Sequence, residues 1–227
     1  MDIKKIKREM TILVVPVVMT LACWPSVSRA QLKKQVLTDQ TELGVVNRKV
    51  ELLQQEGRTV IHADARPGNG IIWINESHFS TGVIEADLKG EDILQQSFVG
   101  IAFDGSNDST YQAVYFRPFN FRSEDPVRRR HAVQYISLPS LDWSFLREKF
   151  PGKYENCLNN PPDPDSWFHI KIIVNTRKVE VFAGSNKKPS LAVQRLPGKG
   201  VGKLGLWVGN NSEGDFSNLT IINKKFK

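Results

Sequence analysis

The sequence has few cysteines and lacks a long apolar run. Among 227 residues there are two cysteines, Cys23 and Cys157. The most apolar stretch, Met10 to Cys23, is shorter than the roughly 20 residues that a membrane-spanning helix needs. We therefore expect no transmembrane span in the mature chain, and a fold stabilised by a hydrophobic core rather than by disulfide bonds.

Motifs for metal and nucleotide chemistry are also missing. None of the four histidines (His62, His78, His131 and His169) lies at His-x-x-x-His spacing or beside a cysteine, so we expect no zinc site. No segment shows a sustained helical pattern or a 20–50-residue repeat, which disfavours parallel βαβ folds, solenoids and propellers. The composition that remains, 40% hydrophobic and 24% charged, is that of an ordinary globular protein.

The first 30 residues have the pattern of a secretory signal peptide. Basic residues between Lys4 and Arg8 precede the apolar stretch, and Ser28-Arg29-Ala30 offers small residues at the −3 and −1 positions. We expect cleavage after Ala30 and a periplasmic or extracellular location. The alternatives are an uncleaved anchor and a lipoprotein modified at Cys23, although Thr20 stands where lipoprotein boxes usually carry a large aliphatic residue.

Removal of residues 1–30 deletes five basic and two acidic side chains, which reduces the formal net charge from +7 to +4. It also leaves Cys157 without a cysteine partner in the chain. We predict that residues 31–48 form a polar leader and that residues 49–227 form a single domain.

The mature chain alternates polar and apolar residues over short runs separated by turn residues, which predicts about ten to twelve strands. We therefore expect an all-β fold, a two-sheet antiparallel β-sandwich of jelly-roll type. The expected strands cover residues 49–53, 58–62, 70–74, 82–90, 97–104, 111–117, 131–138, 167–175, 178–183, 203–208 and 216–222. Residues 140–150 are the best candidate for a helix. The irregular stretches 117–130 and 138–166 contain several aromatic residues, and we expect them to fold over one face of the sandwich.

Several motifs resemble exported bacterial proteins with a concanavalin A-like fold, related to the 3-keto-disaccharide hydrolase-like family of unknown function. The motifs are SFVGIAF at 97–103, YFRPFNF at 115–121, HAVQY at 131–135, GLWVGN at 205–210 and GDFSNL at 214–219. The resemblance covers roughly residues 58–223. It implies a concanavalin A-like jelly roll and a carbohydrate-directed role, but it supplies no catalytic set.

The candidate catalytic carboxylates are Glu85 and Asp87, which alternate along one strand with Lys89. Retaining glycosidases of family 16 place a nucleophile, a helper Asp and an acid at such alternate positions. Lysine cannot replace the carboxylic acid that protonates the leaving group, so we favour a solvated strand face with alternating charges.

Six residues near the irregular stretches are candidates for carbohydrate binding. Planar polar groups bind sugar hydroxyls, and an aromatic ring can stack on the apolar face of a sugar. The candidates are Arg117, Asn120, Arg122, Gln134, Tyr135 and Trp143. The structural alternative pairs Arg117 with a carboxylate such as Asp125.

Two further patterns have simpler interpretations. The run Arg128-Arg129-Arg130 could bind an anionic partner, but we favour a solvated loop, and an exported protein is not expected to bind nucleic acid. Residues 104–108 carry oxygen ligands that could bind calcium, although a simple Asp-Gly turn is favoured, and we expect no other cofactor.

The sequence thus predicts an exported carbohydrate-binding domain without catalytic activity. The first alternative is a hydrolase of 3-keto-glycosides or glucans, with carboxylates drawn from Glu85, Asp87, Glu124, Asp125 and Glu155. The second is an envelope domain that binds a protein partner.

Overall fold

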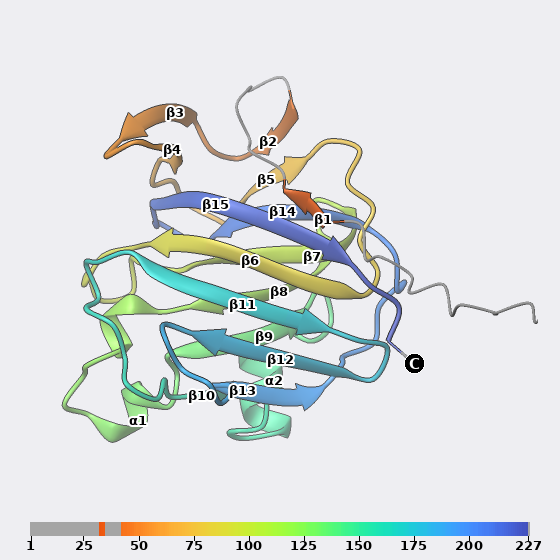
Figure 1. Cartoon of the computed structure of the whole chain (residues 1–227). Coiled ribbons are helices and arrows are strands. Elements are labelled where there is room, and N and C mark those ends of the chain that lie inside the picture. Colours follow the sequence, from red (N-terminus) through yellow and green to blue (C-terminus); the bar gives the residue numbers. More distant parts are fainter. Residues whose placement is uncertain (1–31, 35–41, 227) are drawn as a thin grey trace, which may run out of the picture.

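Two antiparallel sheets packed face to face make up the part of the chain described by the computed structural model, residues 32–34 and 42–226 (Figure 1). Sheet A contains, in spatial order, β13 (Leu191–Gln194), β12 (Lys178–Ala183), β11 (Phe168–Val174), β6 (Gly82–Lys89), β15 (Gly214–Asn223), β4 (Arg58–Ala63) and β3 (Val50–Gln55), with β1 (Leu32–Lys34) paired to β15. Sheet B contains β10 (Glu155–Asn156), β9 (Val133–Ser137), β8 (Thr110–Phe116), β7 (Val99–Asn107), β14 (Lys203–Val208), β5 (Gly70–Ile74) and β2 (Leu43–Val46). The predicted β-sandwich is confirmed.

The core lies between the two sheets and follows the alternation of the strands. In β6, Ile84, Ala86 and Leu88 are buried, whereas the residues between them are half-buried on the outer face. In sheet B, the rings of Phe103 and Tyr135 stack within this core with their centroids 6.1 Å apart. Tyr135, a predicted sugar-binding residue, is therefore part of the core.

The structure differs from the sequence prediction at the shortest strands. The predicted leader, residues 31–48, contributes β1 and β2, and β2 pairs with β5 at the edge of sheet B. The sandwich therefore begins before residue 49. The strands β10 and β13 were also not predicted, because runs of two and four residues carry too little alternation to recognise.

Within the segment 104–108, residues 104–107 do not form a turn, and only Asp108 lies in the turn between β7 and β8. The strand β7 continues to Asn107, and the register with β8 shifts between Phe103 and Asn107, which marks a bulge. Asp104 has a φ of 54° in this bulge. Asp and Asn are sequence signals of turns, and they also tolerate this left-handed conformation inside a strand, so the pattern was misleading.

Three short helices lie in the two irregular stretches: η2 (Pro118–Asn120), α1 (Pro126–Arg129) and α2 (Trp143–Lys149). The predicted helix at 140–150 is confirmed as α2, which Asp142 caps by accepting a hydrogen bond from the backbone N–H of Phe145. Asp125 caps α1 in the same way, so it does not pair with Arg117. In this described part of the chain, no helix has the length and apolar character needed to cross a membrane.

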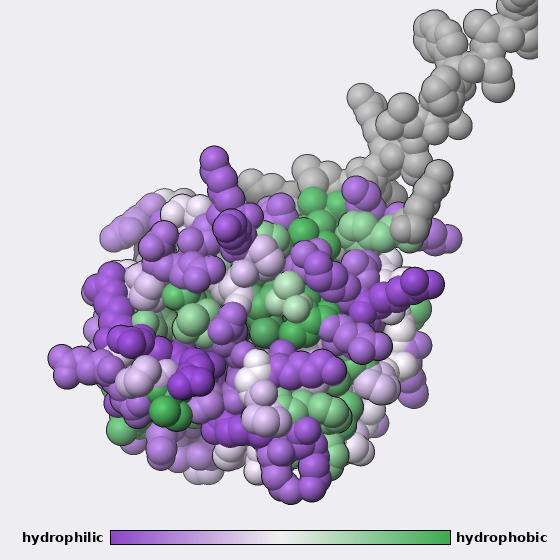
Figure 2. Space-filling view, turned by 90° about the horizontal axis from the view of Figure 1, so that it is seen from below, coloured by the Kyte–Doolittle hydropathy of each residue, from purple (hydrophilic) through white to green (hydrophobic). Residues whose placement is uncertain are grey.

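The irregular stretches cover sheet B, as predicted. The helix α2 packs on β9, and its Leu146 is buried. Consequently both faces of β9 are buried, unlike the alternating strand β6 of sheet A. Figure 2 views the end of the sandwich that carries α1 and α2, where apolar patches lie among mostly hydrophilic side chains.

Candidate functional site

A pocket with a volume of ≈ 770 Å³ lies between sheet B and the segments that cover it. Its size is within the range of small-molecule sites. It is lined by Asn69, Leu94, Gln95, Phe98, Tyr115, Arg117, Phe119, Asn120, Arg128, His131, Ile136, Leu138, Asp142, Trp143, Arg147, Trp207, Gly209 and Asn210.

The floor of the pocket is made by two aromatic residues of sheet B. Tyr115 and Trp207 both pair in register with Gly100, so their side chains share the face of the sheet that points away from the core. Their ring centroids are 4.7 Å apart. A Cβ atom at Gly100 would lie 2.2 Å from the carbonyl oxygen of Val114, so glycine allows the close approach of the strands beneath this floor.

Arg117 crosses the floor as a buried cation with only 6% of its surface exposed. Its guanidinium donates hydrogen bonds to the backbone oxygen of His131 (2.8 Å), the hydroxyl of Tyr115 (2.8 Å) and Oε1 of Gln134 (3.4 Å). It also lies over the rings of Tyr115 and Phe98. Burial lowers the pKa of Arg117, because desolvation disfavours the charged form.

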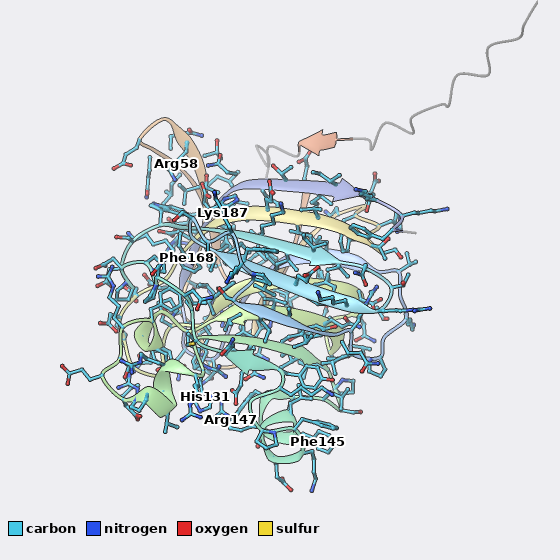
Figure 3. All side chains as sticks on the ribbon, turned by 60° about the horizontal axis from the view of Figure 1, so that its bottom comes forward. Arg58, His131, Phe145, Arg147, Phe168 and Lys187 are labelled. Atoms are coloured by element: carbon cyan, nitrogen blue, oxygen red, sulfur yellow. The ribbon has the colours of Figure 1, made fainter. Side chains whose placement is uncertain are left out.

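Glu155 lies beneath one wall of the pocket and is 4% exposed. Arg147 of α2 donates to both of its carboxylate oxygens, with a shortest distance of 2.7 Å. Nδ1 of His131 lies 2.8 Å from the same carboxylate. Figure 3 shows His131 and Arg147 side by side at this edge of the molecule. Desolvation lowers the pKa of His131, although the nearby Glu155 opposes this shift.

The upper walls come from the short helices. Trp143, at the start of α2, is 47% exposed, and the Arg147 guanidinium lies 5.1 Å from its ring. On the opposite wall, Arg128 of α1 donates to the backbone oxygen of Phe119 (3.0 Å) and to Oδ1 of Asn120 (3.3 Å). The short helices thus carry both an exposed ring and fixed polar groups to the pocket.

The structure brings together four of the six predicted sugar-binding residues. Arg117, Asn120 and Trp143 line the pocket, and Gln134 lies beneath it and supports Arg117. The other two lie elsewhere. Tyr135 points into the core, where it bonds to Gln112, and Arg122 forms an ion pair with Asp163.

Several lining residues were not identified from the sequence. The apolar residues that flank Trp207 indicate a core position, and Trp207 is part of the buried cluster, but its ring also lines the pocket. Of the run Arg128–Arg130, only Arg128 lines the pocket, because the single turn of α1 directs these side chains apart. Trp167 also lies beside an alternating strand, but it is half-buried, with Arg58 over its ring.

The candidate catalytic carboxylates lie in the other sheet. Glu85 and Asp87 are on the outer face of β6 in sheet A, as expected for a charged strand face. Glu85 lies 3.8 Å from the ammonium group of Lys171. Asp87 lies 2.8 Å from Nδ1 of His169 and accepts a hydrogen bond from Asn218. The chain therefore does not bring these two carboxylates to the pocket.

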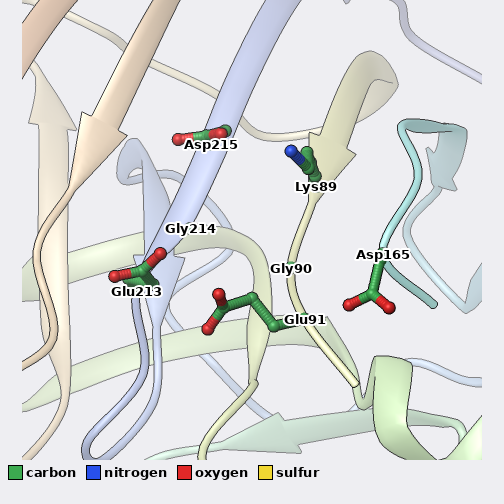
Figure 4. A pocket seen from close by; sticks show the side chains of 7 residues that line it. All are labelled: Lys89, Gly90, Glu91, Asp165, Glu213, Gly214 and Asp215. Atoms are coloured by element: carbon green, nitrogen blue, oxygen red, sulfur yellow. The ribbon is translucent and has the colours of Figure 1, made fainter. Parts of the chain in front are cut away.

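A second, smaller pocket of ≈ 180 Å³ is lined by several acidic side chains. It lies where β6 ends and β15 begins, in the middle of sheet A. Figure 4 shows Glu91 between Glu213 and Asp165. Desolvation, followed by repulsion from Glu213 and Asp165, raises the pKa of Glu91. Within residues 32–34 and 42–226 there is no group of three or more His, Cys, Asp or Glu side chains placed to hold a metal ion.

The calcium hypothesis concerned residues 104–108, in which three side chains each have a different hydrogen-bond partner. Asp104 accepts from the amide of Gln112 (3.0 Å), and Asp108 accepts from the indole N–H of Trp73 (2.8 Å). The side-chain oxygen of Asn107 accepts from the backbone N–H of Ser109. These contacts hold the bulge of β7 and the hairpin that follows it.

No family model and no curated protein sequence matches this chain. Solved structures do match. Carbohydrate-binding module CBM66 from Bacillus subtilis aligns with a TM-score of 0.57 and 13% identity, over 78% of this chain and 93% of that one. The exoplasmic/lumenal domain of VIP36, solved with Ca²⁺ and Man3GlcNAc, aligns with a TM-score of 0.58 and 12% identity, over 86% of this chain and 91% of that one.

The carbohydrate recognition domain of Emp46p, in a metal-free form, aligns with a TM-score of 0.52 and 14% identity, over 84% of this chain and 94% of that one. At these identities the matches establish the fold, a lectin-like jelly-roll sandwich. The resemblance to the 3-keto-disaccharide hydrolase-like family stays a prediction.

Proposed function

We propose that this chain is an exported carbohydrate-binding domain and that the pocket on sheet B is its binding site. The observation that carries the proposal is the combination of an exposed ring, Trp143, with the fixed polar groups of Arg117 and Asn120 around one pocket. A ring of this kind can cover the apolar face of a sugar while planar polar groups bind its hydroxyls.

The structural neighbours support the same function. CBM66 is described as a carbohydrate-binding module, and VIP36 was solved with a bound oligosaccharide. A shared fold alone does not carry a function across. The residues of the pocket are the evidence for binding, and the structural neighbours agree with them.

The small number of carboxylates around the pocket favours binding without hydrolysis. Glycoside hydrolysis usually requires two carboxyl groups that flank the scissile bond. Among the described residues that line the pocket, Asp142 is the single carboxylate, and it is engaged as the cap of α2. Glu155 is buried beneath the wall and paired with Arg147.

We expect Trp143→Ala to weaken glycan binding about five- to tenfold, because the loss of a stacked ring costs about 1–1.5 kcal/mol. Folding should be nearly unchanged, since the side chain is half-exposed. A glycan array identifies the ligand, and titration calorimetry with the strongest ligand measures the affinity of both proteins.

The matched control is Phe145→Ala. Phe145 is an exposed aromatic residue of the same helix that does not line the pocket, and Figure 3 shows it apart from Arg147 and His131. This variant should bind like the original protein. Equal affinity of the Trp143→Ala variant, or no bound glycan on the array, would contradict the proposal.

Export rests on residues 1–30, which lie outside the described residues. Expression of the full chain in a bacterial host and sequencing of the mature N-terminus should give Gln31 as the first residue. A mature protein that retains Met1 would rule out cleavage. One that begins at a lipid-modified Cys23 would support the lipoprotein alternative.

A further inference from the structure

We infer that the ligand of this pocket is an acidic saccharide, and that Arg117 and Arg128 bind the carboxylate of a uronic acid residue. This inference rests on the proposed carbohydrate-binding function and specifies the class of sugar. It is drawn from the charges around the pocket and from the partners that each of those charges has.

Two of the three arginines in the pocket have only uncharged partners. Arg117 donates to a backbone oxygen, a tyrosine hydroxyl and a glutamine amide oxygen. Arg128 donates to a backbone oxygen and to the side-chain oxygen of Asn120. Among the described residues, no carboxylate forms an ion pair with either guanidinium, whereas Arg147 is paired with Glu155.

The pocket therefore has an excess of positive charge. Three arginines face two carboxylates, Asp142 on the lining and Glu155 beneath it, which leaves an excess of one positive charge before His131 is counted. A buried cation without a counter-charge is costly, and a neutral sugar would remove more water from it without supplying a counter-charge. An anionic group on the ligand supplies that compensation.

A carboxylate suits the geometry of the guanidinium groups of Arg117 and Arg128, which have no carboxylate partner among the described residues. Arginine has five N–H donors in a planar fork that matches a carboxylate, and Arg117 uses three of them within the protein. The rings of Tyr115 and Phe98 hold the Arg117 plane, at 4.9 and 5.7 Å from its central carbon. Because the cation is already oriented, little side-chain entropy is lost on binding.

The test compares uronic acid oligosaccharides with their own neutral counterparts. Oligomers of galacturonate, glucuronate and mannuronate are each reduced at the carboxyl group to the neutral sugar, which removes the charge and keeps the backbone. We expect at least one acidic oligomer to bind about tenfold or more tightly than its reduced form, the usual contribution of charged hydrogen bonds. Dextran sulfate and dextran form a second pair of probes.

Variants then assign the effect to the pocket. Arg128→Gln should abolish most of the preference for the acidic form, and Arg117→Gln should do the same if it folds. Arg130→Gln is the matched control, because Arg130 belongs to the same basic run but is exposed and does not line the pocket. This control should keep the full preference.

The outcomes separate the two proposals. Equal binding of acidic and reduced oligomers overturns the acidic ligand and leaves carbohydrate binding intact. Binding of dextran sulfate without any uronate also overturns it, in favour of a sulfate ester. If no glycan of any kind binds, the proposed function fails, and the inference fails with it. A preference that Arg128→Gln and Arg130→Gln reduce equally would show nonspecific attraction rather than this site.

Discussion

Glu155→Ala should lower the melting temperature by about 6–12 °C. The substitution leaves Arg147 without its partner and removes the carboxylate nearest to His131. Breaking a buried ion pair costs about 3–5 kcal/mol, and the lower figure applies because the Arg147 side chain is 34% exposed and can turn toward water. For a domain of this size, each kcal/mol corresponds to about 2–4 °C. Calorimetry or thermal circular dichroism measures the shift.

Two variants control this experiment. Glu148→Ala removes an exposed carboxylate of the same helix and should change stability by less than about 0.5 kcal/mol. Replacement of Arg147 by Met in the Glu155→Ala background should recover part of the loss, because the unpaired cation is then also removed. If the Glu155→Ala variant has the same melting temperature as the original protein, the ion pair between Glu155 and Arg147 does not stabilise this wall of the pocket.

Trp207→Ala should have an effect of similar or larger size on stability and should also weaken glycan binding. Trp207 is 3% exposed, its ring packs on Tyr115, and its indole N–H donates to the hydroxyl of Tyr111 at 3.1 Å. Truncation of a buried tryptophan to alanine costs about 3–5 kcal/mol. Because the ring also forms the floor of the pocket, the sugar would lose its support. Urea denaturation and calorimetric titration measure the two effects.

The control for this prediction is Trp167→Ala on the other sheet. Trp167 is half-buried, precedes β11 and contacts Arg58. Its truncation should cost less stability than that of Trp207 and should leave glycan binding unchanged, since it does not line the pocket. The floor assignment would be wrong if both variants lost binding equally.

Several strands of sheet A were predictable because their buried residues alternate with more exposed ones. In β6, Ile84, Ala86 and Leu88 alternate with polar residues, and an antiparallel sheet with one solvated face requires this alternation. Three of the four strands at the sheet edges, β2, β10 and β13, were missed because their runs are too short to show a period of two. The longer edge strand β3 was predicted.

The site was predictable only in part, because residue type does not reveal which face of a strand is covered. Gln134 and Tyr135 are neighbours in β9, so their side chains point to opposite faces of sheet B. Gln134 supports the pocket, and Tyr135 enters the core. Both faces of β9 are buried, so its hydrophobic pattern could not distinguish them.

The sequence by itself determined the fold class and the helix predicted at 140–150, and it singled out Arg117, Asn120 and Trp143, which line one pocket. These depend on local periodicity and on residue chemistry near irregular segments, which the sequence displays directly. Only the tertiary structure decided that Arg117 and Arg128 line one pocket, neither with a carboxylate partner among the described residues, while Glu155 is committed to Arg147. The reason is that ion pairing depends on distances between segments, which are set by the packing of α1, α2 and β10 on sheet B.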